Sequence, residues 1–468
     1  MVSDEKINGE GPSSDDESLF PSGGTESEDA PKEEDWKDED FLSFDDNQGT
    51  AKPAAASLSS SSSKPLATPL FNHETDLPPW MERAPQMYIN PLIRLHNEIV
   101  QFTNLVGPTQ EETRERQALV ERIRTLVDGV FENQKVTVEV FGSLATGLFL
   151  PSSDIDLVVT TTGNDSDMDE DSDEEDREQG NSSSGPSDLQ KVAQAFREEW
   201  LSELSYLEVI ENTRVPLVKL THAPTSWNID ICFNQDKGVP AANLMVRYLK
   251  DLPPLKPLSF VLKYFLALRE LNEPYSGGVG SFLMQLLVVS FLQQREREAA
   301  QFQRPVNPNL GAMLLEFLEL FGGDLNYITT GISVLNDGSF FPKGAPQRRE
   351  SFFNENRLQL LAVENPLDTT MDVGTSSFRF QMVQRAFATA HKMLLAYLTA
   401  PELKTKSFLA TILPPNDERL WARQSAKESE TQSLLGSEQH KQQSQDSNGN
   451  RNRNRSRSRS RNKRRRSG

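Results

Sequence analysis

The chain has 468 residues, a formal net charge of −20 and 36% hydrophobic residues. It contains no apolar run of about 18 residues, which excludes a membrane-spanning helix, and its single cysteine, Cys232, excludes an intramolecular disulfide framework. The opening residues MVSDEKINGEG lack the pattern of a signal peptide, so we expect an intracellular protein without membrane association.

Composition divides the chain into segments. Residues 1–80, rich in acid, Ser and Pro, are expected to be disordered because they hold too few apolar side chains to form a core. Residues 163–187 have the same character and predict a solvated acidic insertion inside a domain. Residues 413–468 become polar and then basic, and we expect this tail to be disordered too. The cations of residues 451–468 suit RNA phosphates, a nuclear import signal, or both.

Between these segments, the spacing of apolar residues predicts the elements in chain order. Helices are predicted over residues 91–106, 109–131 and 189–204, and strands over residues 136–143, 154–162, 215–222 and 226–234. From residue 241 the spacing becomes helical throughout. The pattern predicts an α+β protein with a mixed domain over 109–240 and a mostly helical domain over 241–412. A helical segment over 81–108 is expected to pack with the helical domain.

Three carboxylates are predicted to share one patch. Asp154 and Asp156 project from the same side of a strand because side chains alternate, and Asp230 lies on a later strand. If the two strands are neighbours, the carboxylates repel one another unless a divalent cation binds. Two Mg²⁺ ions about 3.5–4 Å apart would suit such a cluster and phosphoryl transfer. Aspartates at a strand edge also occur simply as turn residues, so the pair alone leaves both interpretations open.

A Gly-Ser pair, Gly142-Ser143, precedes the aspartates. Glycine lets the backbone approach a phosphate closely, and the turn that follows offers free N–H groups. No GK[ST] sequence is present, so this is not a Walker loop. The pair by itself is a weak signal; the ordered set of strand, Gly-Ser, Asp-x-Asp and a later Asp is far more specific.

Five motifs in order extend this pattern: FGSLATGLFLPSSDIDLVV, NIDICFN, LKYFLALRELNEPYSGGVGSF, NLGAMLLEFLELFG and VENPLDTTMDVG. Together they resemble the non-canonical poly(A) polymerases, and among these the nuclear RNA-surveillance (TRAMP-type) branch. The resemblance covers about residues 81–400. It implies a catalytic lobe of the DNA polymerase β-like nucleotidyltransferase superfamily, a helical central (PAP-associated) lobe, and a nucleotide in the cleft between them.

The resemblance also implies a role for each aspartate. Asp154 and Asp156 would hold both metal ions, Mg²⁺ or Mn²⁺. Asp230 would hold the ion that activates the RNA 3′-hydroxyl.

Further roles are implied for the residues that bind the nucleotide. Gly142 and Ser143 would grip the triphosphate and Lys263 a phosphate. Asn243 would contact the ribose or base, Ser281 a phosphate, and Phe282 would stack on the base. Taken singly, Lys263, Asn243 and Phe282 are also ordinary helix or core residues.

Two positions depart from the family pattern. Phe282 stands where a Tyr is usual, and Thr375 stands where an Arg is usual, which puts the order of the nucleotide loop in question. The stretch TTMDVG lacks the histidine typical of uridylyltransferases, which favours ATP.

The sequence therefore predicts an RNA 3′-end adenylyltransferase of nuclear RNA quality control and exosome-linked decay. A uridylyltransferase and a catalytically weak scaffold are the alternatives. The resemblance implies ATP and RNA 3′ ends as substrates, and a zinc-knuckle RNA-binding protein and an RNA helicase as partners.

Overall fold

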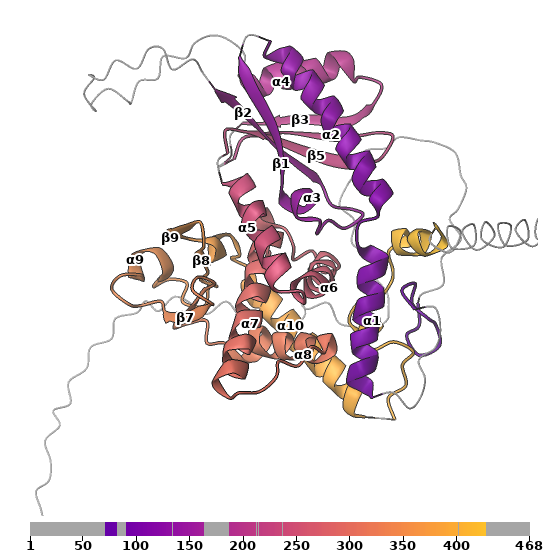
Figure 1. Cartoon of the computed structure of the whole chain (residues 1–468), viewed down its shortest axis with the longest axis vertical. Helices are drawn as coiled ribbons and strands as arrows, with labels where there is room; N and C mark the ends of the chain where they lie inside the picture. Colours follow the sequence, from indigo (N-terminus) through magenta and orange to yellow (C-terminus); the bar gives the residue numbers. More distant parts are fainter. Residues whose placement is uncertain are drawn as a thin grey trace, which may run out of the picture. The chain divides into compact units, whose positions relative to one another are not determined.

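The computed structural model describes residues 71–81, 90–132, 134–162, 187–211, 213, 215–235, 237–400 and 402–426. Figure 1 shows these residues as ribbons. The predicted acidic insertion, the first 70 residues and the basic tail lie outside the described residues. Among the helices described, none has the length and apolar character needed to cross a lipid bilayer.

One five-stranded sheet forms the first lobe. Its strands are β1 (Lys135–Phe141), β2 (Ile155–Thr162), β3 (Leu204–Ile210), β4 (Leu217–His222) and β5 (Trp227–Phe233). They lie in the order β1-β2-β5-β4-β3, with β2 and β5 parallel and the other pairs antiparallel. A short helix, α3 (Gly142–Thr146), connects β1 to the loop before β2. The parallel pair lies near the middle of the sheet.

Helices α2 (Gln110–Val130) and α4 (Asp188–Glu199) pack with the sheet in one apolar core (Figure 1). Ile155 and Leu157 of β2 and Ile229 and Ile231 of β5 are fully buried there. Strand side chains alternate, so burying these positions turns the residues between them to the opposite face. The apolar alternation therefore decides which way the predicted aspartates point.

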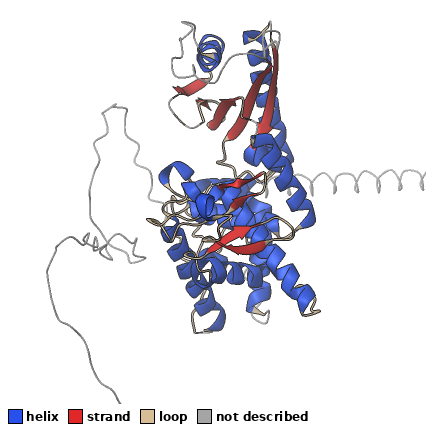
Figure 2. Cartoon of the chain, turned by 90° about the vertical axis from the view of Figure 1, so that its left-hand side faces the viewer, coloured by secondary structure: helices blue, strands red, loops and turns tan. Residues whose placement is uncertain are grey.

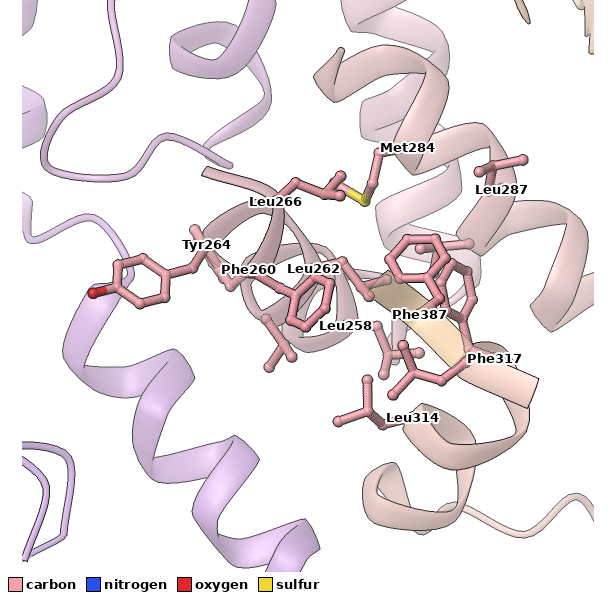
Figure 3. Close-up of a cluster of buried hydrophobic side chains, with 14 of the residues drawn as sticks. Leu258, Phe260, Leu262, Tyr264, Leu266, Met284, Leu287, Leu314, Phe317 and Phe387 are labelled. Carbon is pink, nitrogen blue, oxygen red and sulfur yellow. The ribbon is translucent and has the colours of Figure 1, made fainter. Parts of the chain in front are cut away.

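The second lobe is built on five longer helices. These are α5 (Gly238–Asp251), α6 (Leu255–Ala267), α7 (Ser281–Gln301), α8 (Leu310–Glu319) and α10 (Phe380–Thr399). Their core includes the residues drawn in Figure 3, where Phe260 and Leu262 of α6 lie near Phe317 and Phe387. Helix α1 (Pro91–Val106) packs against α6 and α8. Residues 283–293 of α7 are buried all round, which explains why they are apolar except for Gln285, Ser290 and Gln293.

Short strands lie between α8 and α10, as Figure 2 shows in red. A π-helical turn, η3 (Leu320–Asp324), is followed by the pair β6 (Thr330–Ser333) and β7 (Ser339–Pro342), and helix α9 (Arg349–Phe352) precedes the pair β8 (Glu364–Asn365) and β9 (Asp368–Asp372). The amine of Lys343, only 2% exposed, donates to the carbonyl oxygens of Tyr327, Leu358 and Leu360 at 2.8–3.0 Å. This buried cation holds the segment before β8 in place.

The predicted α+β class and its order of a mixed lobe before a helical lobe are confirmed. One predicted helix is too long. It was expected to reach residue 204, but α4 ends at Glu199, and residues 204–210 form β3, an unexpected strand. Trp200 is the C-cap residue of α4: its N–H still donates to the Phe196 carbonyl, and its ring packs edge-on against Phe196 at 5.2 Å.

The ordered chain also extends past both expected boundaries. Residues 71–80 are not disordered: Trp80 is 4% exposed and its ring packs edge-on against Phe102. Residues 413–426 are ordered as well, with residues 418–426 helical. There, Arg423 donates to the carbonyl oxygens of Leu105 and Gly107 and forms an ion pair with Glu112. Few apolar residues mark these segments, so composition did not reveal them.

Candidate active site

The structure brings the three predicted aspartates together. Asp156 of β2 pairs in register with Asp230 of β5, because the two strands run parallel and side by side. Asp154 lies just before β2, and its Oδ1 accepts a hydrogen bond from Asn228 Nδ2 of β5 at 3.1 Å. Asp156 and Asp230 alternate with the buried isoleucines, so they lie on the face of the sheet opposite α2 and α4.

Burial and mutual repulsion shift the pKa values of this cluster. Burial, together with the negative charges of Asp230 and Asp154, raises the pKa of Asp156 to about 7. Lys263 and the Ser143 N–H act in the opposite direction. Burial also raises the pKa of Asp230, against the attraction of Lys219. The nearby cations therefore do not fully compensate the negative charge of the cluster.

Lys219 is one compensating cation that the sequence analysis missed. It lies on β4 in register with Asp230, and its Nζ faces Asp230 Oδ1 at 3.5 Å. That oxygen is buried and has no hydrogen bond of normal geometry. Glu273, before the turn η2 (Pro274–Ser276), is a further missed acid: burial and the charge of Asp154 raise its pKa. Strand alternation in VPLVKLTH was the only sequence signal for Lys219, and none marked Glu273.

The donor set of this cluster fits divalent cations. Carboxylate oxygens are the ligands that Mg²⁺ and Mn²⁺ prefer, and Asp230 Oδ1 is buried without a hydrogen-bond partner. In the part of the chain that the structure describes, no group of three or more His, Cys, Asp or Glu side chains is placed so that it could hold a metal ion. Binding would therefore have to draw the carboxylates together and loosen the contact between Asp230 and Lys219.

Gly142 lies directly against this cluster. Its φ is +62°, in the left-handed region, and a Cβ placed there would overlap Asp156 Oδ2 and lie 2.9 Å from Asp156 Cγ. The Ser143 N–H lies near the Asp156 carboxylate and acts to lower its pKa. A side chain at position 142 would therefore disturb this aspartate directly.

A buried arginine holds the loop that carries Asp154. Arg116 of α2 is 1% exposed and donates to the carbonyl oxygens of Ser153 at 2.9 Å and Pro151 at 3.3 Å. Its guanidinium lies over the rings of Phe149 and Trp227, at 4.7 and 4.5 Å from their centroids. Cation–π contacts and two carbonyl acceptors compensate part of its desolvation, although burial still lowers its pKa and its Nε has no acceptor. Sequence analysis missed Arg116, which looks like an ordinary polar position of an amphipathic helix.

Lys263 of α6, predicted to bind a phosphate, contacts the loop that precedes Asp154. Its Nζ donates to the Leu148 carbonyl at 3.2 Å and to Ser153 Oγ at 3.0 Å, on the same loop that Arg116 holds. Burial lowers the pKa of its amine to about 8, while Asp156 and Asp154 act in the opposite direction. In this structure Lys263 is a counter-charge for the aspartates and an anchor of their loop.

A cavity of about 440 Å³ adjoins the cluster and is lined by both lobes. Of the residues predicted to bind a nucleotide, four line it: Gly142, Ser143, Ser281 and Phe282. Lys263 is not among the lining residues. Asn243 is not either; it is exposed on α5, where Ala242 and Met245 face the cavity instead. Gly142 connects the two parts of the site, because it lines the cavity and touches Asp156.

The far wall of the cavity is the segment after β8, which includes Thr375. Asp372 holds this segment, since its Oδ1 accepts from the N–H groups of Val363 at 2.8 Å and Gly374 at 2.7 Å. Thr375 Oγ1 donates to the Asp372 carbonyl at 2.9 Å. The loop is therefore ordered locally although the usual Arg is absent. At its edge, Lys237 forms an ion pair with Asp368 at 2.9 Å, a link that sequence analysis missed.

This combination of a mixed sheet, in-register carboxylates and an adjoining two-lobed cavity defines a nucleotidyltransferase fold. Comparison with known proteins gives the same result. Residues 95–250 match the family model of the mitochondrial-like poly(A) RNA polymerase central palm domain, and residues 309–371 match the Cid1 family poly A polymerase model.

Two curated relatives and one solved structure illustrate the match. Poly(A) RNA polymerase cid14 of Schizosaccharomyces pombe is 33% identical over 65% of this chain and 41% of its own length. The inactive non-canonical poly(A) RNA polymerase protein Trf4-2 of Drosophila melanogaster is 33% identical over 64% of this chain and 68% of its own. A solved polymerase core of TRAMP, an RNA surveillance complex, has 27% identity and a TM-score of 0.56, covering 69% of this chain and 95% of that one.

The chain belongs to the non-canonical poly(A) RNA polymerase family. It spans about two fifths of the length of the curated relatives gld-4 of Caenorhabditis elegans and cid14.

Proposed function

We propose that this chain is a template-independent RNA 3′-end adenylyltransferase that adds AMP from ATP. The observation that carries the proposal is the in-register pair Asp156 and Asp230 at the edge of the cavity that Gly142 and Ser143 line. Phosphoryl transfer depends mainly on positioning and on stabilising charge, which such a site supplies.

In the proposed reaction the RNA 3′-oxygen forms a bond to the α-phosphorus of ATP, the bond to the β-phosphate oxygen breaks, and pyrophosphate leaves. Asp154, Asp156 and Asp230 would hold two Mg²⁺ or Mn²⁺ ions, which supply charge stabilisation for the attacking and leaving oxygens. The proton of the hydroxyl passes to a basic oxygen of the carboxylate cluster or to solvent. Arg116 and Lys263 keep the loop of Asp154 in position, and Phe282 offers an aromatic face to the base.

Membership in this family also supports a proposal about the cellular process in which the chain acts. Because the chain resembles a TRAMP polymerase core, we propose a role in nuclear RNA quality control that feeds RNA to exosome-linked decay. A zinc-knuckle RNA-binding protein and an RNA helicase are the proposed partners, and the nucleus is the proposed location.

A catalytically weak scaffold is the second candidate. The Drosophila relative that matches over 68% of its length is named inactive, and in this chain Asp230 already faces Lys219. Against this candidate, all three aspartates are present and share one patch.

The test is extension of a labelled oligo(A) by the purified full chain with Mg²⁺ and each NTP in turn. We expect extension with ATP, little with UTP, and none by Asp156→Asn, whose neutral side chain weakens metal binding but fits the same space. Preferential use of UTP would identify a uridylyltransferase. A well-folded chain that fails to extend the RNA with any of the NTPs would instead support the scaffold.

A further inference from the structure

Two large aromatic side chains are exposed beside the candidate active site. Tyr275, in the turn η2, is 84% exposed, and Phe378, just before α10, is 51% exposed. Met382, on the first turn of α10, is 41% exposed. Single exposed apolar residues are common, but several gathered around one rigid turn indicate a binding surface.

Backbone contacts hold this surface in shape. The ring of Phe378 lies over Gly277, where an added Cβ would come within 2.6 Å of ring atom Cδ2. The Arg379 N–H donates to the Gly277 carbonyl at 2.9 Å, and Gly278 N–H donates to the Glu273 carbonyl at 2.9 Å. The turn with Tyr275 is thus fastened to the start of α10. A fixed aromatic face loses little conformational entropy when a ligand stacks on it.

The surface borders both parts of the candidate site. Glu273, two residues before Tyr275, interacts electrostatically with Asp154, Asp230 and Lys219. On the other side, Ser376 lines the cavity and lies two residues before Phe378. An RNA whose 3′ end reaches the aspartates would therefore pass next to these rings.

On its α10 side the surface carries positive charge, although the protein is acidic. The whole chain carries a net charge of −20, yet residues 373–400 contain no Asp or Glu. Arg379, Arg385 and Lys392 lie in this stretch, and Met382, Arg385 and Lys392 follow one exposed face of α10 at helical spacing. Exposed rings next to backbone-binding cations are the usual arrangement for single-stranded nucleic acid.

We propose that Tyr275, Phe378, Arg379 and Met382 form an aromatic platform that binds the last nucleotides of a single-stranded RNA by stacking. This proposal rests on the proposed function, since it assigns the place of the RNA substrate. Bases stack on the two rings, and the cations of α10 contact the phosphates that follow. Stacking accepts any base, so the platform predicts RNA capture with little sequence preference.

The test compares full-length variants Tyr275→Ala, Phe378→Ala and Tyr275→Phe. Fluorescence anisotropy with a labelled 15-nucleotide oligo(A) gives the RNA Kd, and extension assays give separate KM values for RNA and ATP. Each Ala change should raise the RNA Kd and KM roughly 5- to 150-fold, the equivalent of losing one stacked base. Tyr275→Phe keeps the ring and should stay near the unchanged protein. The ATP KM should not move in any variant.

Phe302→Ala is the matched control. Phe302 is 60% exposed, but it follows the far end of α7 and lies about 30 Å along that helix from Ser281. It should leave RNA binding unchanged. If Tyr275→Ala and Phe378→Ala also leave RNA binding unchanged, the platform proposal is wrong, and a protein partner becomes the candidate for this surface.

The binding measurement also separates this proposal from the proposed function. A chain that extends no RNA, yet binds oligo(A) through Tyr275, would refute the enzyme and retain the platform. A chain that adds AMP normally after loss of both rings would refute the platform and retain the enzyme.

Discussion

Gly142→Ala tests whether the glycine keeps the aspartate cluster in its geometry. At φ +62° a non-glycine residue is strained by roughly 1–2 kcal/mol. The new Cβ would also lie 2.9 Å from Asp156 Cγ and closer still to Oδ2, where ordinary contacts begin at 3.4 Å. The carboxylate would have to retreat by roughly 1 Å, and a misplacement of that size costs about 10²-fold in rate.

Gly147→Ala separates the two effects, since Gly147 lies at the other end of α3 with φ +68° and nothing within 4 Å of an added Cβ. Urea unfolding should show a loss of roughly 1–2 kcal/mol for Gly147→Ala and at least that much for Gly142→Ala. In the oligo(A) extension assay at saturating ATP and RNA, only Gly142→Ala should lose about 10²-fold in kcat. Equal activity in the two variants would refute the argument that the missing side chain protects Asp156.

Three further predictions follow from contacts in the same lobes. Phe282→Ala should raise the ATP KM roughly 5- to 150-fold if the ring stacks on the base, whereas Phe282→Tyr should be tolerated; an unaltered KM in the Ala variant would make Phe282 a core residue only. Arg116→Met should lower the free energy of unfolding by roughly 2–4 kcal/mol, because two partly buried carbonyls lose their donor, and urea titration measures the loss. Asp372 has its pKa raised to about 6 by burial, so the folded state binds its proton more tightly than the unfolded state. Its contribution to stability should therefore fall as pH rises from about 4 to about 6, by roughly 3 kcal/mol in all, and Asp372→Asn should remove that part of the slope in unfolding titrations across this range.

The aspartates could be predicted from the sequence because side chains on a strand alternate between its two faces. Buried Ile155 and Leu157 force Asp156 to the other face, and this depends only on local geometry. The roles of residues on helices were harder to predict. Whether Lys263 or Asn243 faces a nucleotide depends on how each helix is rotated against the other lobe, which no local pattern encodes. The structure turns Lys263 toward the loop of Asp154 and leaves Asn243 exposed outside the cavity.

Long-range pairs could not be predicted for the same reason. Lys219 and Asp230 meet through strand register, and Arg116 reaches Ser153 across 37 residues of sequence. Strand β3 was also missed, because the predicted helix was extended to residue 204, whereas residues 204–210 pair with β4. In each case tertiary packing, not local propensity, made the choice.

The contacts of Arg423 join the two lobes at the point where the chain passes between them. The chain passes from α1, in the helical lobe, to α2, in the sheet lobe, through Gly107 and Pro108. Arg423 binds Leu105 and Gly107 on one side of this crossing and Glu112 on the other, so it acts as a brace across a hinge. A chain cut after residue 412 would keep every side chain of the cavity and the aspartate cluster. It would nevertheless lose this link between the two lobes, together with the buried side chains of Leu413 and Leu420.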